Sequence, residues 1–127
     1  MEDVGRFLIS NDATGKQLDG GMKYKLHLPS NIPVVNFWSV IVYDSLSRLI
    51  ISTDQPWPSV FKSSRRLVIN QDGSVDIRFG PEVSADTAGN SIKTIPGKTW
   101  YMILNLYGLT ESSIDNFWKP GEIEEEF

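Results

Sequence analysis

The chain contains no cysteine and a single histidine, His27, among its 127 residues. The lack of cysteine excludes a disulfide framework, a thiol nucleophile and a thiolate metal site. A transition-metal site normally needs at least two histidine or cysteine ligands, so His27 is expected to be a surface residue and no metal or cofactor is predicted. Neither count fixes the compartment in which the protein works.

The local motifs of common enzyme classes are also missing. No Gly-x-Ser-x-Gly elbow is present for a Ser-His-Asp triad, and the loop "GPEVSADTAGN" has few glycines and carries acids where a phosphate would bind. Paired carboxylates for glycoside hydrolysis stay open, with Asp44, Asp54, Asp76 and Glu82 as candidates. The oxygen atoms of "NQDGS" suit calcium, but Asp-Gly between strands is typical of a simple turn. We therefore predict no catalytic residue.

Positive charge is scattered along the chain. Lys and Arg number 12 against 16 Asp and Glu, for a net charge of −4, and only "KSSRR" groups basic residues. Without a basic stripe, no nucleic-acid partner is expected. The apolar run near the N-terminus is too short for a signal peptide or a membrane span, so no membrane partner is expected and the localisation stays open. The acidic segment 122–127 is predicted to be a solvated tail.

What the chain does have is a series of short strand patterns separated by turn signals. Residues 22–28, "MKYKLHL", alternate apolar and basic side chains, which predicts a strand with one solvated face. Residues 37–44, "FWSVIVYD", are apolar on both parities and predict a central strand buried on both sides. Asp72-Gly73 lies between two apolar runs and predicts a hairpin. Residues 109–118 predict two turns of helix, capped by Ser112 or Ser113.

The densest apolar stretch is "TWYMILNLYG", residues 99–108. As a strand it would direct Trp100, Met102, Leu104 and Leu106 to one face, which we predict to be core, and Tyr101, Ile103, Asn105 and Tyr107 to the other. Seven or eight such strands with frequent turns and one short helix indicate a single all-β domain over residues 1–127, either a sandwich or a barrel.

Five ordered blocks of the sequence resemble one known family. They are Phe37-Trp38-Ser39 with Tyr43-Asp44, Asp72-Gly73-Ser74, Pro96-Gly97-Lys98 with Trp100, Leu106-Tyr107-Gly108, and Trp118. In this order they resemble the domain of unknown function 1214 family, and the likeness runs from about residue 12 to residue 124. Two positions depart from the family pattern, namely Ser91 in place of an aromatic residue and Asn105 where a basic residue is common.

The resemblance implies an antiparallel, jelly-roll-like β-sandwich of about seven to nine strands. It also implies a partner, because this domain usually forms the C-terminal part of longer proteins, behind a domain of unknown function 1254. Here the chain starts at Met1 and is expected to stand alone. A surface that the partner domain covers in relatives would then be exposed or would associate with a second copy. The family supplies no catalytic residues that could be carried over.

A candidate binding surface comes from the non-core face of the central strands. Aromatic planes beside hydrogen-bonding groups on a sheet suit a small polar ligand. The residues predicted to share this surface are Ser39, Tyr43, Arg78, Tyr101, Asn105 and Tyr107. The competing interpretation is that the face is covered, either by the loop holding Trp57 and Phe61 and the helix holding Trp118, or by another subunit.

Two functions follow from these observations. The favoured one is a non-catalytic β-sandwich module that associates with a partner chain or with itself as a homo-oligomer. The alternative is a carbohydrate-binding or carbohydrate-active protein that uses the tyrosine-rich face to bind a small polar ligand.

Overall fold

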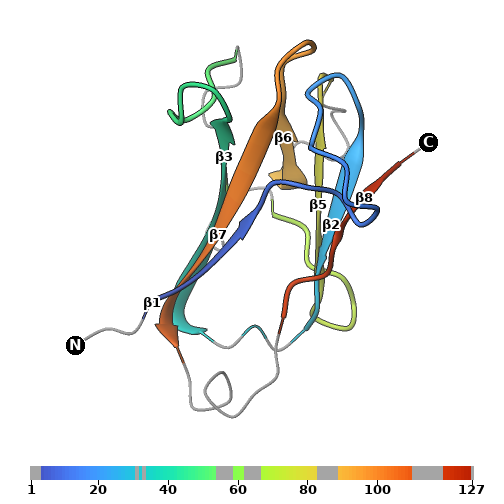
Figure 1. Cartoon of the computed structure of the whole chain (residues 1–127). Coiled ribbons are helices and arrows are strands. Elements are labelled where there is room, and N and C mark those ends of the chain that lie inside the picture. Colours follow the sequence, from blue (N-terminus) through green and yellow to red (C-terminus); the bar gives the residue numbers. More distant parts are fainter. Residues whose placement is uncertain are drawn as a thin grey trace.

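The computed structural model describes residues 4–30, 32, 34–53, 59–61, 67–82, 89–109 and 119–126. These residues form eight strands in two layers and no α-helix (Figure 1). The strands are β1 Val4–Ile9, β2 Tyr24–Leu28, β3 Val34–Asp44, β4 Ser59–Phe61, β5 Val75–Gly80, β6 Ser91–Lys93, β7 Trp100–Leu109 and β8 Ile123–Glu125. The predicted helix at 109–118 lies almost wholly outside the described residues. The described part of the chain has no helix of the length and apolarity needed to cross a membrane.

Each layer is a four-stranded sheet. One sheet has the order β1-β7-β3-β4 and is antiparallel throughout. The other has the order β6-β5-β2-β8, in which only β5 and β6 run parallel. The prediction of an all-β sandwich is confirmed, and the barrel alternative is wrong because the strands form two separate sheets.

The core lies between the two sheets and follows the alternation of the strands. Along β7 the predicted set is buried, with Trp100, Met102 and Leu104 fully inaccessible to solvent. Trp100 connects the layers, since its ring lies 5.7 Å from the ring of Tyr24 on β2 and 4.8 Å from that of Phe79 on β5, measured between centroids. Such aromatic contacts add to the free energy gained from burying apolar surface.

The strand predicted at 37–44 is only partly as expected. β3 directs Trp38, Val40 and Val42 into the core, but Ile41 and Tyr43 on its other face are only half-buried. The apolar residues on both parities therefore do not mean burial on both sides. They mean a core face and an outer face that is itself rich in apolar side chains.

The hairpin predicted around Asp72-Gly73 is wrong in one arm. The turn forms, with Gly73 at φ 88° and a hydrogen bond from its N–H to the carbonyl oxygen of Asn70. Residues 67–70 are not a strand, however, and Val68 is 57 % exposed. Asn90 explains why, because its side-chain amide binds both the N–H and the C=O of Val68 and takes the place of a neighbouring strand.

The acidic end of the chain also differs from expectation. Instead of extending into solvent, Ile123–Glu125 forms β8 and pairs with β2. Ile123 is fully buried in the core, whereas Glu124 is exposed. One apolar residue in an acidic run thus suffices to place the segment at the edge of a sheet, because burying an isoleucine side chain contributes about 1.5–3 kcal/mol.

Candidate functional site

The main candidate surface is the outer face of the β1-β7-β3-β4 sheet, which we call the Tyr face. Cross-strand pairs fix its members, because residues directly opposite each other in an antiparallel pair point to the same side. Ser39 lies opposite Asn105, Ile41 opposite Ile103, and Tyr43 opposite Tyr101. The Tyr face comprises Arg6, Leu8, Ser39, Ile41, Tyr43, Ile50, Tyr101, Ile103, Asn105 and Tyr107.

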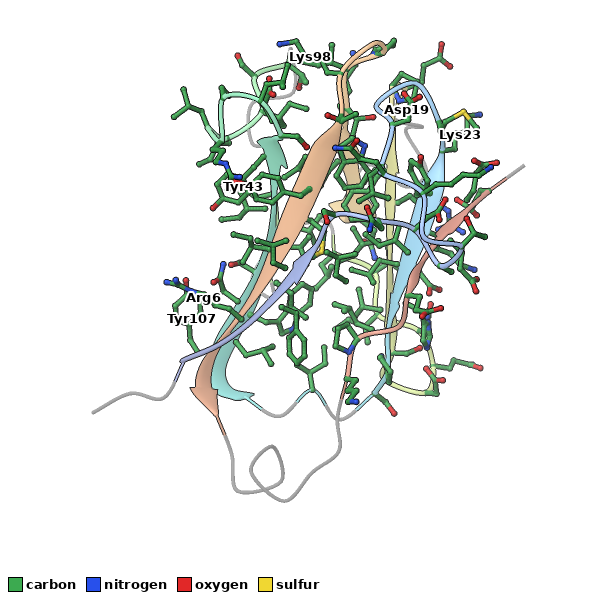
Figure 2. All side chains as sticks on the ribbon, in the orientation of Figure 1. Arg6, Asp19, Lys23, Tyr43, Lys98 and Tyr107 are labelled. Carbon is green, nitrogen blue, oxygen red and sulfur yellow. The ribbon has the colours of Figure 1, made fainter. Side chains whose placement is uncertain are left out.

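Five of the six predicted site residues are brought together here. Ser39 and Tyr43 come from β3, and Tyr101, Asn105 and Tyr107 come from the neighbouring β7. Tyr43 and Tyr107 point away from the sandwich (Figure 2). Their role in ligand binding stays a prediction, but their placement on one face follows from the period of two in these strands.

Arg78 is the exception, and the prediction that it lies beside these residues is wrong. It belongs to β5 in the other sheet, where it lies opposite Lys25 and Ser91. Its side chain is on the outer side of that sheet, since its neighbours Ile77 and Phe79 are in the core. The sequence showed that Arg78 faces away from the core but could not show which sheet contains β5.

Tyr43 and Tyr101 form the centre of the Tyr face. Their rings are stacked, with centroids 5.2 Å apart and planes 10° from parallel. Stacking fixes both side chains at low entropic cost and uses one face of each ring for the internal contact. The pair therefore makes a rigid aromatic ridge across two strands.

The polar residues of the face lie deeper than the tyrosines. Ser39 is 2 % exposed and Asn105 is 6 % exposed. Little of either polar group is therefore available to a ligand at the surface.

Apolar side chains surround the aromatic pair and are accessible. Leu8 on β1 is 61 % exposed and lies opposite Ile103, while Ile50 is 53 % exposed and bridges to Tyr43. The adjoining turn after β3 adds Leu46 and Leu49, which are more exposed still. A contiguous exposed apolar area of this kind is typical of a surface that contacts another molecule.

An ion pair at the rim holds the turn that carries these leucines. The Lys98 ammonium lies 3.1 Å from the Asp44 carboxylate, which also accepts hydrogen bonds from the N–H groups of Leu46 and Ser47. The bonds from Leu46 and Lys98 lower the pKa of Asp44. The Asp44 carboxylate thus stabilises the turn after β3, and its ion pair with Lys98 helps to hold the carboxylate in place.

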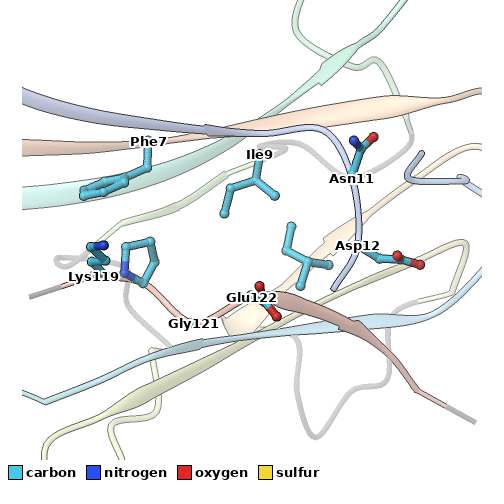
Figure 3. A pocket seen from close by; sticks show the side chains of 9 residues that line it. Phe7, Ile9, Asn11, Asp12, Lys119, Gly121 and Glu122 are labelled. Carbon is cyan, nitrogen blue, oxygen red and sulfur yellow. The ribbon is translucent and has the colours of Figure 1, made fainter. Parts of the chain in front are cut away.

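A second candidate site is a hollow at the open edge of the sandwich, between β1 and the segment that leads into β8 (Figure 3). It has a volume of about 260 Å³, with Phe7, Ile9 and Ile123 as its apolar walls and Lys119 and Glu122 at its rim. Asp12 also lines it, but its carboxylate accepts hydrogen bonds from Thr14 and Lys16, and the bond from Thr14 is the largest cause of its lowered pKa. The Asp12 carboxylate is thus engaged by its own turn.

The opposite side of the molecule is the outer face of the β6-β5-β2-β8 sheet, which we call the charged face. Acidic side chains of the β8 segment lie beside basic side chains of β2, and β5 adds one residue of each sign. The charged face comprises Lys23, Lys25, His27, Asp76, Arg78, Glu124 and Glu126.

His27 is exposed on this face, as predicted, but it has a partner that the sequence did not indicate. Its Nδ1 lies 2.7 Å from the carboxylate of Asp76, which also accepts a hydrogen bond from Asn70. Burial raises the pKa of Asp76, but the bonds from His27 and Asn70 and the nearby cations outweigh it and leave the pKa lowered. Among the described residues, no three His, Asp or Glu side chains are grouped so that they could hold a metal ion.

The possible calcium loop has a structural role. The Asp72 carboxylate accepts hydrogen bonds from both the hydroxyl and the N–H of Ser74, which lower its pKa. These bonds are local turn contacts of the kind that Asp commonly makes. Of the other carboxylates considered for glycoside hydrolysis, Asp44 and Asp76 lie in different sheets and Glu82 is exposed. Asp54 lies outside the described residues.

Three contributors were missed because the strands that carry or precede them were not predicted. Arg6 and Leu8 belong to β1, whose residues do not alternate strictly between polar and apolar. Glu126 follows β8, which is hidden in an acidic run. The one available signal was the buried-type residue Ile123 between glutamates, since a single alternation is too short to predict a strand.

Comparison with known proteins supports the fold. The structure of the VPA0106 protein from Vibrio parahaemolyticus is similar, with a TM-score of 0.83 and 23 % identity over 98 % of this chain and 31 % of that one. An uncharacterised protein from Burkholderia cenocepacia gives a TM-score of 0.52 and 16 % identity, over 95 % of this chain and 34 % of that one. The chain thus spans about a third of the length of these solved proteins.

A search of curated proteins found no match. The family described as "Protein of unknown function (DUF1214)" matches residues 5–111, which is most of the chain and includes every strand of the Tyr face. The chain therefore belongs to the DUF1214 family.

Proposed function

We propose that this protein is a non-catalytic β-sandwich module that associates with another protein surface, or with a second copy of itself, through the Tyr face. The observation that carries the proposal is the exposed apolar cluster of Leu8, Ile50 and the neighbouring turn leucines around the stacked Tyr43 and Tyr101. Removing such side chains from water supplies about 25 cal/mol for each Å² of apolar surface.

The geometry of the face suits a flat partner. Side chains on an outer sheet face can pack against a second layer at a separation of about 10 Å, as in the interior of a sandwich. The Tyr43–Tyr101 stack makes a rigid centre, and rigid aromatic residues are enriched among those that dominate binding energy at interfaces. The buried Ser39 and Asn105 add little polar surface that would have to be desolvated.

The charges on and beside the Tyr face indicate which kind of partner surface would be complementary to it. Among the described residues, Arg6 is the only charged one on the Tyr face, although the whole chain has a net charge of −4. Arg48 in the adjoining turn adds a second exposed cation. A matching surface would be apolar at its centre and acidic at its rim, because complementary potentials favour the encounter and the correct orientation.

The size of the face sets the expected affinity. Four strands about 4.8 Å apart, over six residues of about 3.4 Å each, give roughly 400 Å² of flat area. A standard protein interface buries about 800 Å² on each partner. The turn that carries Leu46 and Leu49 therefore has to take part, and we expect self-association of modest strength.

The length of the two solved relatives supports the proposal that this surface contacts further protein. In both solved structures the region similar to this chain is about a third of the whole. Further protein is therefore available in those chains to contact the equivalent surface. The same surface of this chain is therefore suited to contact with further protein.

The alternative is that the Tyr face binds a carbohydrate. Stacking of Tyr43 on Tyr101 occupies one side of each ring, and burial of Ser39 and Asn105 limits the hydrogen bonds open to a sugar. Both features favour protein association. A sugar bound at a hundred times its dissociation constant would still raise the unfolding free energy by about 2.7 kcal/mol, so thermal unfolding with a glycan panel distinguishes the two functions.

The main test is the solution mass, measured by light scattering on a sizing column from micromolar to several hundred micromolar. We expect the mass to rise with concentration for the wild type and to stay at the monomer value for Leu8→Glu. The matched control is Val68→Glu, because Val68 is 57 % exposed but lies outside the Tyr face.

A photo-cross-linking residue at position 8, compared with one at position 68, extends the test to a separate partner. Adducts of defined mass at position 8 alone would support the proposal. A monomeric wild type with no adduct specific to position 8 would overturn it.

A further inference from the structure

The charged face contains a recess that the proposed function does not use. It lies over β2, β5 and β6 and has a volume of about 260 Å³. Its floor includes Gly80 and Ser91, and charged side chains form its walls, namely Lys23, Arg78, Glu82 and Glu126. Of the predicted ligand-binding residues, Arg78 is the one placed here.

The recess exists because β5 has a glycine at this point. Gly80 lies between Lys23 and the β6 residue Lys93, on the outer side of the sheet. A Cβ at position 80 would come within 3.4 Å of the Lys23 Cγ atom. Any larger side chain would therefore project between Lys23 and the strand beside it, and would fill the space that now separates the two cations of the recess.

With respect to the residues that the structure describes, both cations retain unused hydrogen-bond donors. Arg78 contacts Glu126 through Nε, at 3.3 Å, and its terminal nitrogens make no hydrogen bond or ion pair with any residue that the structure describes. The Lys23 ammonium likewise has no hydrogen bond or ion pair within the described ranges. A guanidinium has five N–H donors and an ammonium three, so most of the binding capacity of the recess is open.

The recess already holds one carboxylate from the chain itself. The backbone N–H of Glu126 donates to the carbonyl oxygen of Lys23 at 2.8 Å, which places the Glu126 side chain against Arg78. The two side chains are 34 % and 40 % exposed. An ion pair this exposed contributes little to stability, so another anion can replace the carboxylate at small cost.

We infer that this recess binds a small oxyanion, a carboxylate or a phosphate group, which displaces Glu126 from Arg78 and is held jointly by Arg78 and Lys23. Guanidinium groups bind both anions through paired N–H donors, and a nearby ammonium adds charge. Glu82 at the rim repels the anion and keeps the binding weak. The site is separate from the Tyr face, so the inference does not depend on the proposed function.

The experiment is a titration of the full chain with inorganic phosphate and, separately, with malonate, at constant ionic strength. Binding is followed by the NMR shifts of the backbone amides of Lys23, Gly80 and Ser91. Arg78→Gln is expected to weaken binding by about tenfold, since it removes the guanidinium. Glu126→Gln is expected to tighten it by about threefold or more, because the internal competitor is lost.

The control is Lys25→Gln, which removes a cation from the same face without altering the lining of the recess. It should weaken binding less than Arg78→Gln does, because Lys25 lies opposite Arg78 but does not line the recess, so it contributes charge and no hydrogen bond to the anion. A response to phosphate alone would identify the ligand class as phosphates, and a response to malonate alone would identify it as carboxylates.

A response to both would support a general oxyanion site. The inference is overturned if neither anion shifts these amides, or if Arg78→Gln and Lys25→Gln weaken binding equally. It is also overturned if Glu126→Gln fails to tighten it.

Discussion

The outer faces of the two sheets differ in charge and in what covers them. On the Tyr face, Arg6 is the only charged residue in the part of the chain that the structure describes, and Leu8 is exposed. On the charged face, cations of β2 lie beside acids of the β8 segment, and Arg78 pairs with Glu126. On the charged face, charged groups therefore lie beside groups of opposite sign from the same chain. On the Tyr face, by contrast, apolar side chains are exposed to water.

This difference indicates separate uses for the two sides. Apolar area gains free energy from any partner that excludes water, and the gain does not require a particular charge. A charged recess gains only from a ligand of matching sign and size. The protein contact and the small-anion site that we propose lie on opposite sides of one sandwich, because its strands alternate between core and surface.

The largest expected effect separates the core side of β7 from the Tyr face. Leu104→Ala should lower the free energy of unfolding by about 2–5 kcal/mol, because Leu104 is fully buried and its loss leaves a cavity. Leu8→Ala changes the same side chain at a site that is 61 % exposed and should cost less than about 0.5 kcal/mol. Urea unfolding of both variants measures the contrast, and equal losses would show that Leu8 belongs to the core.

A smaller effect is expected at β8, where Ile123 is the buried residue of the strand. Ile123→Ala should destabilise the protein by about 2 kcal/mol, at the low end for such changes, because a three-residue edge strand can detach locally. Amide exchange gives the more specific readout. The Glu126 N–H, which binds the Lys23 carbonyl oxygen, should exchange faster, while amides of β7 stay protected. Unchanged exchange at Glu126 would contradict the anchoring role of Ile123.

Acid should affect the charged face through Asp76. Its pKa is lowered in the folded protein, so its ionisation stabilises the fold above the unfolded pKa of about 3.9, and this contribution is lost as the pH falls through the folded value. Asp76→Asn should therefore be less stable than the wild type near pH 7, and the two should converge once the pH falls below the folded pKa of Asp76. Urea unfolding across this range tests the prediction, and a constant difference at all pH values would contradict it.

The smallest effect is expected from the exposed ion pair. Arg78→Gln should change the free energy of unfolding by no more than about 1 kcal/mol at low salt, and by less in molar salt, since exposed charges are screened. Self-association through the Tyr face should instead persist in molar salt, because apolar contacts are not screened. Thermal unfolding and solution mass at two salt concentrations measure both, and association lost at high salt would reverse the assignment of the two faces.

The sequence predicted the alternation within strands better than the arrangement of strands. The core set along β7 and the solvated side of β2 were predicted correctly, because the period of two depends only on backbone geometry. The arm before Asp72-Gly73 was wrongly predicted as a strand, since the apolar run there is held by the Asn90 side chain. No local pattern indicates a contact between residues 22 positions apart.

The candidate site shows the same limit. The sequence allowed us to group Ser39, Tyr43 and the outward residues of β7. Within a strand, the alternation of side chains shows which residues face away from the core. Arg78 could not be assigned to a sheet, because strand order is decided by which apolar faces pack together over the whole chain. The recess beside it needed four separate segments, namely the residue before β2, the β5 segment, β6 and the residue after β8.

By itself, the sequence determined that this is an all-β chain with strongly apolar strands, one histidine and no cysteine. It also determined which side chains of each strand face together, since that follows from local backbone geometry. Only the tertiary structure decided that β8 completes one sheet and that β1 completes the other. Long-range pairing depends on burying surface from distant segments at once, so the free energy that selects it belongs to no single segment.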